Sequence, residues 1–407
     1  MMLSNFNLRK VLIIAGFAVV VVGLGFAIYF AFFRIPAEEP VETPETQEGA
    51  QTGTLPTSGE AENKPGQQTE TPTGTGVLPT AKTLRVSDFA FSGAKDITMS
   101  ENGRDLQYYD SESGLFYKVN ENGSLTPLSN KKFFQVQNVS WSGDNSKAVL
   151  EYPDGSNIFY DFKTDKQVTL PKHWEDFDFS TDGNKIISKS MGIDSNNRWL
   201  VISDTNGTNA KAIADLGDNA DRVQVAWSPN NQVVGFSSTG DPTSEFGTQE
   251  VYLVGQNKEN FKSLKVQGLN FQAKWTTEGD RILYSVADPN NGYRPVLYAT
   301  DASGDNVGSN TVKIDLNTPL EKCVIISGYK AYCAVPKDLA EGTGLDMRLA
   351  ENTSDSFYFI DLKTGATSMI AGTEEKYDVS QISVSADEKY IYFTDKSVNG
   401  LHQIKID

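Results

Sequence analysis

The chain has 407 residues, a formal net charge of −17, two histidines and two cysteines. The acidic balance excludes a nucleic-acid binder, because binding a phosphate backbone needs clustered lysine and arginine side chains. Two histidines and two cysteines also disfavour zinc and haem sites, since they cannot form a four-ligand thiolate or imidazole set. The length allows one large domain or two ordinary ones.

Residues 11–33 predict a single membrane-spanning helix. The segment has 23 residues without a charge, and at about 1.5 Å per residue it spans the roughly 30 Å hydrocarbon core. A cleaved signal peptide is the alternative, although its apolar core is normally only about 7 to 15 residues long. Arg9 and Lys10 precede the segment, and Arg34 on the other flank makes the charge asymmetry small. We expect a single-pass plasma-membrane protein with residues 1–10 in the cytoplasm and the rest outside.

Residues 34–82 predict a disordered linker. The stretch 35–82 contains seven of the sixteen prolines, eight acidic residues and no aromatic side chain. Such a composition cannot bury enough apolar surface to offset the entropy lost on ordering. We expect the linker to hold residues 83–407 away from the bilayer. A threonine-rich stalk carrying O-linked sugar and a spacer without a selected length are the alternatives.

One pattern recurs seven times after residue 83: an apolar strand, serine or threonine, a turn rich in Asp, Asn and Gly, and a second apolar strand. The copies are marked by Ser100, Ser142, Ser180, Ser228, Thr276, Ser327 and Ser385. A third strand follows each copy, and a short fourth strand follows most of them. Four short antiparallel strands at this period are typical of a β-propeller blade. We therefore predict an all-β, seven-bladed propeller over residues 83–407.

The ends of the repeat region predict how the ring closes. The last copy has only three strands before Asp407, whereas residues 82–91 alternate like a strand and belong to no copy. We predict that this N-terminal strand completes the last blade, so that the N- and C-terminal strands seal the ring and leave no open sheet edge there.

The repeated phrase resembles the WD-like repeats of the TolB-type propeller family. The nearest matches are Trp-Ser-Pro-Asn at 227–230 and Phe-Ser-Thr-Asp-Gly at 179–183. The motif stabilises a turn through side-chain to backbone hydrogen bonds, and we expect Trp141, Trp227 and Trp275 at matched positions to pack between blades. Such proteins serve as periplasmic adaptors or as the propeller in front of a serine hydrolase. The resemblance implies the adaptor role, because the sequence has no Gly-x-Ser-x-Gly elbow.

Cys323 and Cys333 flank a predicted hairpin near Gly328 in the sixth unit, which lacks the usual turn. In a symmetric register the two cysteines face each other across neighbouring strands. An extracytoplasmic location favours oxidation, so we predict a disulfide. Two buried thiols are the alternative.

The sequence predicts no catalytic residue, metal or cofactor. No carboxylate pair is marked out by its spacing, and no Asp-x-Asp-x-Asp-Gly calcium loop occurs. The connections between second and third strands grow long in units four to six, and long loops are either functional or loose. Aromatic and arginine side chains are the usual anchors of a partner. The candidate binding residues in these loops are Phe246, Tyr293, Arg294, Met347 and Arg348.

The favoured function is a membrane-tethered, extracytoplasmic and non-enzymatic binding or adaptor module. Its expected partners are another cell-envelope component, with a protein favoured, and the lipid bilayer through residues 11–33. A propeller that binds or cleaves cell-surface glycan is the alternative. A purely structural surface protein that self-associates is a third class.

Overall fold

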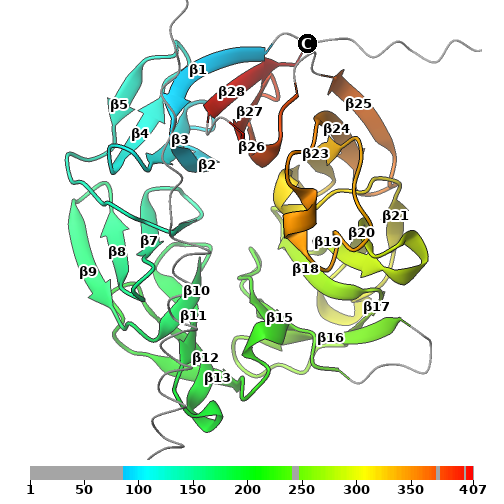
Figure 1. Cartoon of the computed structure of the whole chain (residues 1–407). Helices are drawn as coiled ribbons and strands as arrows, with labels where there is room; N and C mark the ends of the chain where they lie inside the picture. Colours follow the sequence, from blue (N-terminus) through cyan, green and yellow to red (C-terminus); the bar gives the residue numbers. More distant parts are fainter. Residues whose placement is uncertain (1–85, 241–246, 373–375, 398–399, 407) are drawn as a thin grey trace, which may run out of the picture. The chain divides into compact units, whose positions relative to one another are not determined.

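The computed structural model describes residues 86–240, 247–372, 376–397 and 400–406. Twenty-eight strands form seven four-stranded antiparallel sheets, arranged in a ring (Figure 1). The prediction of an all-β, seven-bladed propeller is therefore confirmed.

The predicted membrane helix and linker lie outside the described residues. In the part of the chain that the structure describes, no helix is both long and apolar enough to cross a membrane.

Each blade runs from an inner strand at the centre of the ring to an outer strand at its edge. Blades 1 to 3 comprise β2 (Ala94–Met99), β3 (Leu106–Asp110), β4 (Leu115–Val119) and β5 (Leu125–Pro127); β6 (Asn138–Trp141), β7 (Lys147–Glu151), β8 (Asn157–Asp161) and β9 (Lys166–Leu170); and β10 (Trp174–Phe179), β11 (Lys185–Met191), β12 (Arg198–Asp204) and β13 (Lys211–Asp215). Blades 4 and 5 comprise β14 (Val223–Val225), β15 (Val233–Ser237), β16 (Thr248–Gly255) and β17 (Leu264–Gln267); and β18 (Leu269–Trp275), β19 (Arg281–Asp288), β20 (Arg294–Asp301) and β21 (Val312–Ile314).

The last two blades contain the disulfide and the ring closure. Blade 6 comprises β22 (Cys323–Ser327), β23 (Lys330–Pro336), β24 (Asp355–Asp361) and β25 (Thr367–Gly372). Blade 7 comprises β26 (Val379–Val384), β27 (Tyr390–Asp395), β28 (Gly400–Lys405) and, as its outer strand, β1 (Val86–Ser92).

The repeated Ser-x-Asp-Gly phrase forms the turn between the inner and second strands. In blade 3 the hydroxyl of Ser180 donates to Asp182 at 2.5 Å and accepts from the backbone N–H of Lys185 at 3.0 Å. Gly183 has φ of 62°, a left-handed conformation that glycine adopts without a Cβ clash. The motif therefore specifies blade geometry, as expected from the sequence.

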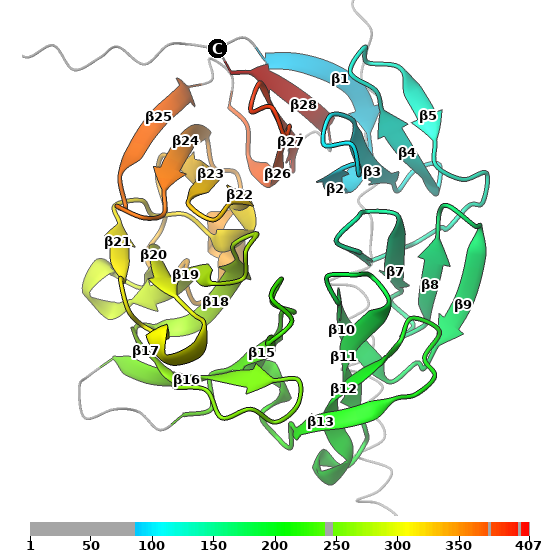
Figure 2. The same cartoon turned by 180° about the vertical axis from the view of Figure 1, so that it is seen from behind.

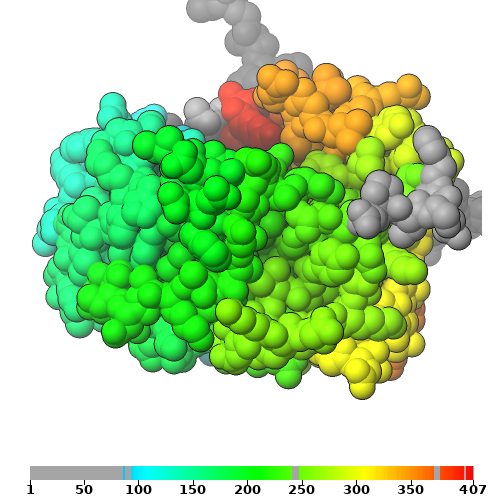
Figure 3. Space-filling model, turned by 90° about the horizontal axis from the view of Figure 1, so that it is seen from below, coloured from blue at the N-terminus to red at the C-terminus, as the bar shows by residue number. Residues whose placement is uncertain are grey.

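The cores lie between blades, because each sheet buries both faces against its neighbours. Figure 3 shows the outer surface of neighbouring blades in contact, in green and yellow. Trp141 of blade 2 packs edge-on against Phe116 of blade 1, with ring centroids 5.5 Å apart. Trp275 of blade 5 stacks on Phe236 of blade 4 at 5.1 Å. Trp227 is buried in the cluster that joins blades 3 and 4. The tryptophans therefore pack between blades, as predicted.

The ring closes through strands from both ends of the repeat region. β1 pairs antiparallel with β28, with Val86 opposite Ile404 and Asp88 opposite His402. Figure 2 shows these first and last strands side by side. The closure predicted from residues 82–91 is confirmed, and it pairs the edge of β28 that would otherwise be open.

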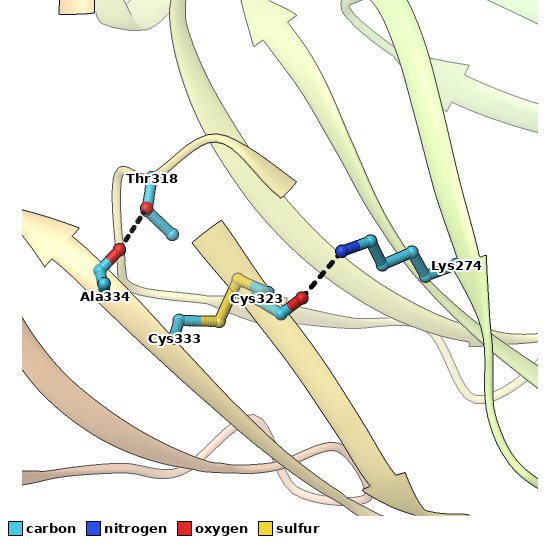
Figure 4. The surroundings of a disulfide bond; sticks show 5 residues. All are labelled: Lys274, Thr318, Cys323, Cys333 and Ala334. Carbon is cyan, nitrogen blue, oxygen red and sulfur yellow. Dashed lines mark hydrogen bonds between the residues drawn. A yellow bond between two sulfur atoms is a disulfide. The ribbon is translucent and has the colours of Figure 1, made fainter. Parts of the chain in front are cut away.

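The two cysteines form the predicted disulfide. Cys323 on β22 and Cys333 on β23 are directly opposite in the strand register, and their sulfurs are bonded at 2.05 Å (Figure 4). Both residues are buried in the core between blades 5 and 6. The disulfide thus joins the inner strand of blade 6 to its second strand.

Replacing both cysteines with alanine should lower the free energy of unfolding by about 2 to 3 kcal/mol, because the disulfide closes a short loop, of sequence separation 10, in the unfolded chain. Urea unfolding of the double variant and the oxidised wild type measures the difference. Reductant should shift the wild-type midpoint and leave the variant unchanged. Equal midpoints for the oxidised wild type and the variant would contradict the prediction.

Candidate functional site

The strand order decides which loops share a face of the ring. Because successive strands of a blade are antiparallel, the turns after inner strands emerge on one face. The connections between second and third strands emerge on the other face, where each inner strand also begins. We call this second face the loop face; among the described residues it includes 192–197, 238–240, 289–293 and 337–354.

A cavity of about 760 Å³ opens on the loop face over blades 2 to 5, and we call it the mouth cavity. It is lined mainly by polar side chains at the starts of inner strands. They include Asn138 of β6, Asp176 of β10, Gln224 of β14 and Asn270 of β18, and Leu345 of the 337–354 loop borders them.

A second cavity of about 360 Å³, the side cavity, adjoins the mouth cavity. The two cavities share Gln224, Asn270 and Gln272 in their linings. Lys274 and Met347 line the side cavity but not the mouth cavity. The two cavities therefore lie side by side, and the side cavity extends to the 337–354 loop of blade 6.

Bulges in the inner strands shape the mouth cavity. Asp176 and Asn270 have φ of 54° and 52°, and the strand register shifts at both positions. Aspartate and asparagine tolerate the left-handed region better than other residues with a Cβ, and a bulge redirects side chains. Asp176 pairs with the buried Lys189 at 2.6 Å, while the amide of Asn270 donates to the carbonyl of Gly344 at 2.8 Å.

Two charged side chains on inner strands each tie one blade to the next. Asp178 accepts hydrogen bonds from the backbone N–H groups of Trp227, in blade 4, at 2.7 Å and of Phe179 at 2.8 Å. Burial raises the pKa of Asp178 to about 6, although both hydrogen bonds act in the opposite direction. Lys274 of blade 5 donates to the carbonyl of Cys323 in blade 6 at 2.7 Å. Burial lowers the pKa of Lys274 to about 8.

A buried charge cluster fixes the end of the 337–354 loop. The ammonium of Lys322 lies 2.7 Å from a carboxylate oxygen of Asp355 and 3.0 Å from one of Asp378, and all three side chains are buried. Asp378 also accepts from the backbone N–H of Asn352 at 2.7 Å, and Thr353 donates to Asp355 at 2.8 Å. The cluster therefore joins the loop to blades 6 and 7.

Blade 5 holds the first part of the same loop. The guanidinium of Arg294 donates to the carbonyl of Leu339 at 2.8 Å, and the carbonyl of Tyr293 accepts from the backbone N–H of Gly344, also at 2.8 Å. Long loops without such contacts sample many conformations. This loop instead has fixed points near both ends and in its middle.

The five candidate binding residues have different positions. Phe246 lies outside the described residues. Tyr293 and Arg294 support the long loop, and Met347 lines the side cavity. Arg348 is exposed and forms an ion pair with Asp346 at 2.7 Å. Their roles in binding remain predictions.

Sequence reasoning missed the polar residues of the inner strands. In β18, Asn270, Gln272 and Lys274 alternate with Phe271, Ala273 and Trp275. This alternation was visible in the sequence and indicates a strand with one polar face. Within a propeller the inner strand faces its neighbours and the centre of the ring, so a polar face there marks a candidate site.

No protein-family model matches the chain, and no curated protein matches it. In structure it is similar to an oligogalacturonate lyase in complex with manganese, with a TM-score of 0.54, 13% identity, and coverage of 81% of this chain and 98% of that one. It is also similar to the β-propeller domain of Myceliophteria thermophila Cps50 (Swd1), with a TM-score of 0.52, 9% identity, and coverage of 79% and 100%. The common feature is the β-propeller fold. Among the described residues of this chain, no group of three or more His, Cys, Asp or Glu could hold a metal ion.

Replacing Asp178 with asparagine should change how stability depends on pH. The folded pKa of about 6 lies above the usual aspartate pKa of 3.8, so wild-type stability should fall by about 3 kcal/mol as pH rises from about 4 to 6. The variant should lack this loss, so its free energy of unfolding should increase relative to that of the wild type as pH rises from about 4 to 6. Urea unfolding at pH 4, 5, 6 and 7 measures both curves.

Asp182→Asn is the matched control for that experiment. Hydrogen bonds from Ser180 and Asn184 lower the pKa of Asp182, so its ionised form stabilises the folded state above the unfolded pKa. This variant should lose stability relative to wild type as pH rises, the opposite sign to Asp178→Asn. Parallel pH curves for wild type and Asp178→Asn would contradict the assigned role of Asp178.

Replacing Lys322 with methionine should destabilise the protein by about 3 to 5 kcal/mol, because it leaves buried Asp355 and Asp378 without their cation. Hydrogen exchange across residues 337–354 should accelerate. Lys330→Met is the control, because its pair with Glu388 is partly exposed and should contribute less than about 1 kcal/mol. Unchanged exchange in the 337–354 loop would show that the cluster does not hold it.

Proposed function

We propose that this protein is a membrane-tethered, extracytoplasmic propeller that binds another cell-envelope protein through its loop face and acts as a non-enzymatic adaptor. The tether in this proposal is the predicted helix at 11–33, followed by the linker at 34–82. The chain would then present the propeller outside the membrane, at a distance set by the linker.

Exposed apolar side chains beside a recessed polar cavity carry the proposal. Leu345 and Leu349 of the long loop are 48% and 49% exposed, and Leu269 at the start of β18 is 41% exposed. Leu269 and Leu345 border the mouth cavity. Exposed apolar side chains on one face of a protein supply area that leaves water when a partner binds.

The fixed geometry of the long loop also supports a binding role. Ordering a mobile loop on association would cost conformational entropy and weaken the complex. The Lys322 cluster and the contact between Arg294 and Leu339 hold this loop before any partner arrives. Leu345 and Leu349 are therefore presented on a preorganised segment.

The polar groups of the mouth cavity support a non-enzymatic role. Of the two carboxylates in its lining, Asp176 is neutralised by Lys189, whereas Asp221 is exposed and forms no ion pair among the described residues. The amide side chain of Gln224 makes two hydrogen bonds to the backbone of Ala273, at 2.7 and 2.8 Å. Asp176 and Gln224 are therefore occupied in joining elements of the ring, which leaves Asp221 as a single carboxylate without a paired acid or base. General acid and base chemistry needs a group that is free to exchange a proton with a substrate.

A propeller acting on cell-surface glycan is the second candidate. The amide-rich mouth cavity favours it, and so does the fold shared with an oligogalacturonate lyase. Sugar rings commonly stack on exposed aromatic faces, whereas Phe177 and Phe271 in this lining are only 6% and 4% exposed. The protein partner therefore remains the favoured one.

Replacing Leu345 and Leu349 with serine should reduce capture of the partner protein at least tenfold, since each leucine contributes apolar area at the interface. The full chain, solubilised in detergent, is used to capture proteins from the envelope of the source cell, and isolated wall glycan is tested in parallel. Retention of one stoichiometric protein is quantified for wild type and variant.

Met369→Ser is the matched control, because Met369 is 39% exposed but lies on the outer strand β25 of the same blade. Capture should be unchanged in this variant. Retention of glycan without any protein would overturn the adaptor proposal and favour the second candidate. Equal capture by wild type and the double leucine variant would remove the loop face from the interface.

A further inference from the structure

The side cavity contains three polar side chains on one face of the blade 5 sheet. Gln272 lies opposite Ser285 in the strand register, and Lys274 lies opposite Leu283. Residues opposite each other or two apart point to the same side of a sheet. Leu283 packs in the core between blades 5 and 6. Gln272, Lys274 and Ser285 therefore point from blade 5 toward blade 6.

These side chains have hydrogen-bond donors to spare. The ammonium of Lys274 has three hydrogens and one acceptor among the described residues, the carbonyl of Cys323 at 2.7 Å (Figure 4). Within the same described part of the chain, neither the amide of Gln272 nor the hydroxyl of Ser285 forms a hydrogen bond. All three residues line the side cavity. The cavity thus offers an incompletely paired cation and two neutral donors.

Such an arrangement is costly for folding alone. Lys274 is partly buried, so its ammonium loses part of its hydration, and one carbonyl replaces only some of what is lost. The surrounding interface between blades 5 and 6 is otherwise an apolar core that includes Leu283, Leu297 and Ile360. An apolar side chain in place of Lys274 would extend that core. A desolvated cation in a cavity is instead typical of a site that binds a ligand.

The cavity limits the size and charge of its ligand. Gly344 and Met347 of the long loop line it from the loop face, and its volume of about 360 Å³ suits the end of a chain or a single side chain. Glu321 also lines the cavity and carries one negative charge. Its repulsion disfavours a doubly charged phosphate and is weaker for a singly charged group.

We propose that the side cavity binds a carboxylate group of the partner protein, with Lys274 as the cation and Gln272 and Ser285 as hydrogen-bond donors. This inference rests on the proposed adaptor function and identifies the chemistry that its site recognises. Ammonium, amide and hydroxyl donors can together saturate two carboxylate oxygens. Leu345 and Leu269 at the neighbouring mouth would contact apolar parts of the same segment.

Small probes test the carboxylate site directly. The full chain in detergent is titrated with N-acetylglycylglycine and with its C-terminal amide, and dissociation constants are measured by ligand-observed NMR. We expect the free carboxylate to bind at least tenfold more tightly than the amide. Equal affinities would overturn the proposal.

Galacturonate and galactose form a second pair of probes. If galacturonate binds and N-acetylglycylglycine does not, the carboxylate belongs to a glycan acid and not to a partner protein.

Two variants with opposite expected effects assign the site to Lys274. Lys274→Met removes the charge, with an unbranched side chain one atom shorter, and should raise the dissociation constant of the carboxylate probe at least tenfold. Glu321→Gln removes a repulsive charge from an exposed position. This variant should lower the dissociation constant of the carboxylate probe about two- to fivefold. Lys265→Met, on the outer strand β17, removes the same charge away from the cavity and should change nothing. A similar loss in Lys265→Met and Lys274→Met would show a general charge effect and overturn the assignment.

The capture experiment separates this inference from the adaptor proposal. If Lys274→Met retains the partner fully while Leu345→Ser with Leu349→Ser loses it, the adaptor function stands and the carboxylate site is wrong. If both lose it, both proposals are supported. Melting temperatures of the variants verify folding, and Glu321→Gln provides the test if Lys274→Met does not fold.

Discussion

Burial of both faces of every sheet is the constraint on which the rest of this structure depends. A single four-stranded blade leaves two apolar faces in water, and only a neighbour on each side covers them. The ring must therefore close, and the pairing of β1 with β28 closes it with strands from both ends of the repeat region. The seven clusters of buried apolar side chains are the result.

The same constraint explains why polar residues at the blade interfaces are informative. Most of these interfaces are apolar, so a charged group within them is costly unless it is paired or serves a function. Asp178 has two backbone donors, and Lys322 has two carboxylates. Lys274 has one carbonyl and an adjoining cavity. Lys274 therefore also joins two blades, but its pairing is less complete, which is why we propose it as the group that binds a ligand.

Ring closure also gives the loop face its capacity for binding. A closed ring of packed sheets is a rigid base, and the connections that emerge on one face can then vary in length without altering the core. The 337–354 loop uses this freedom, yet it is fastened to blades 5, 6 and 7. Its exposed leucines are consequently held beside the mouth cavity, where a partner could contact both.

The sequence by itself determined the blade count, the closing strand and the disulfide, because these depend on local periodicity and on turns that hydrogen-bond within a few residues. Cys323 and Cys333 needed only a hairpin register. The sequence did not identify the cavities. The backbone carbonyl of Tyr293 and the guanidinium of Arg294 hold the long loop, a role that their residue types did not indicate. Gln272, Lys274 and Ser285 form one donor set only when β18 and β19 pair and blade 6 packs beside them. Tertiary structure alone decided this, because a cavity is the space between elements that are distant in sequence.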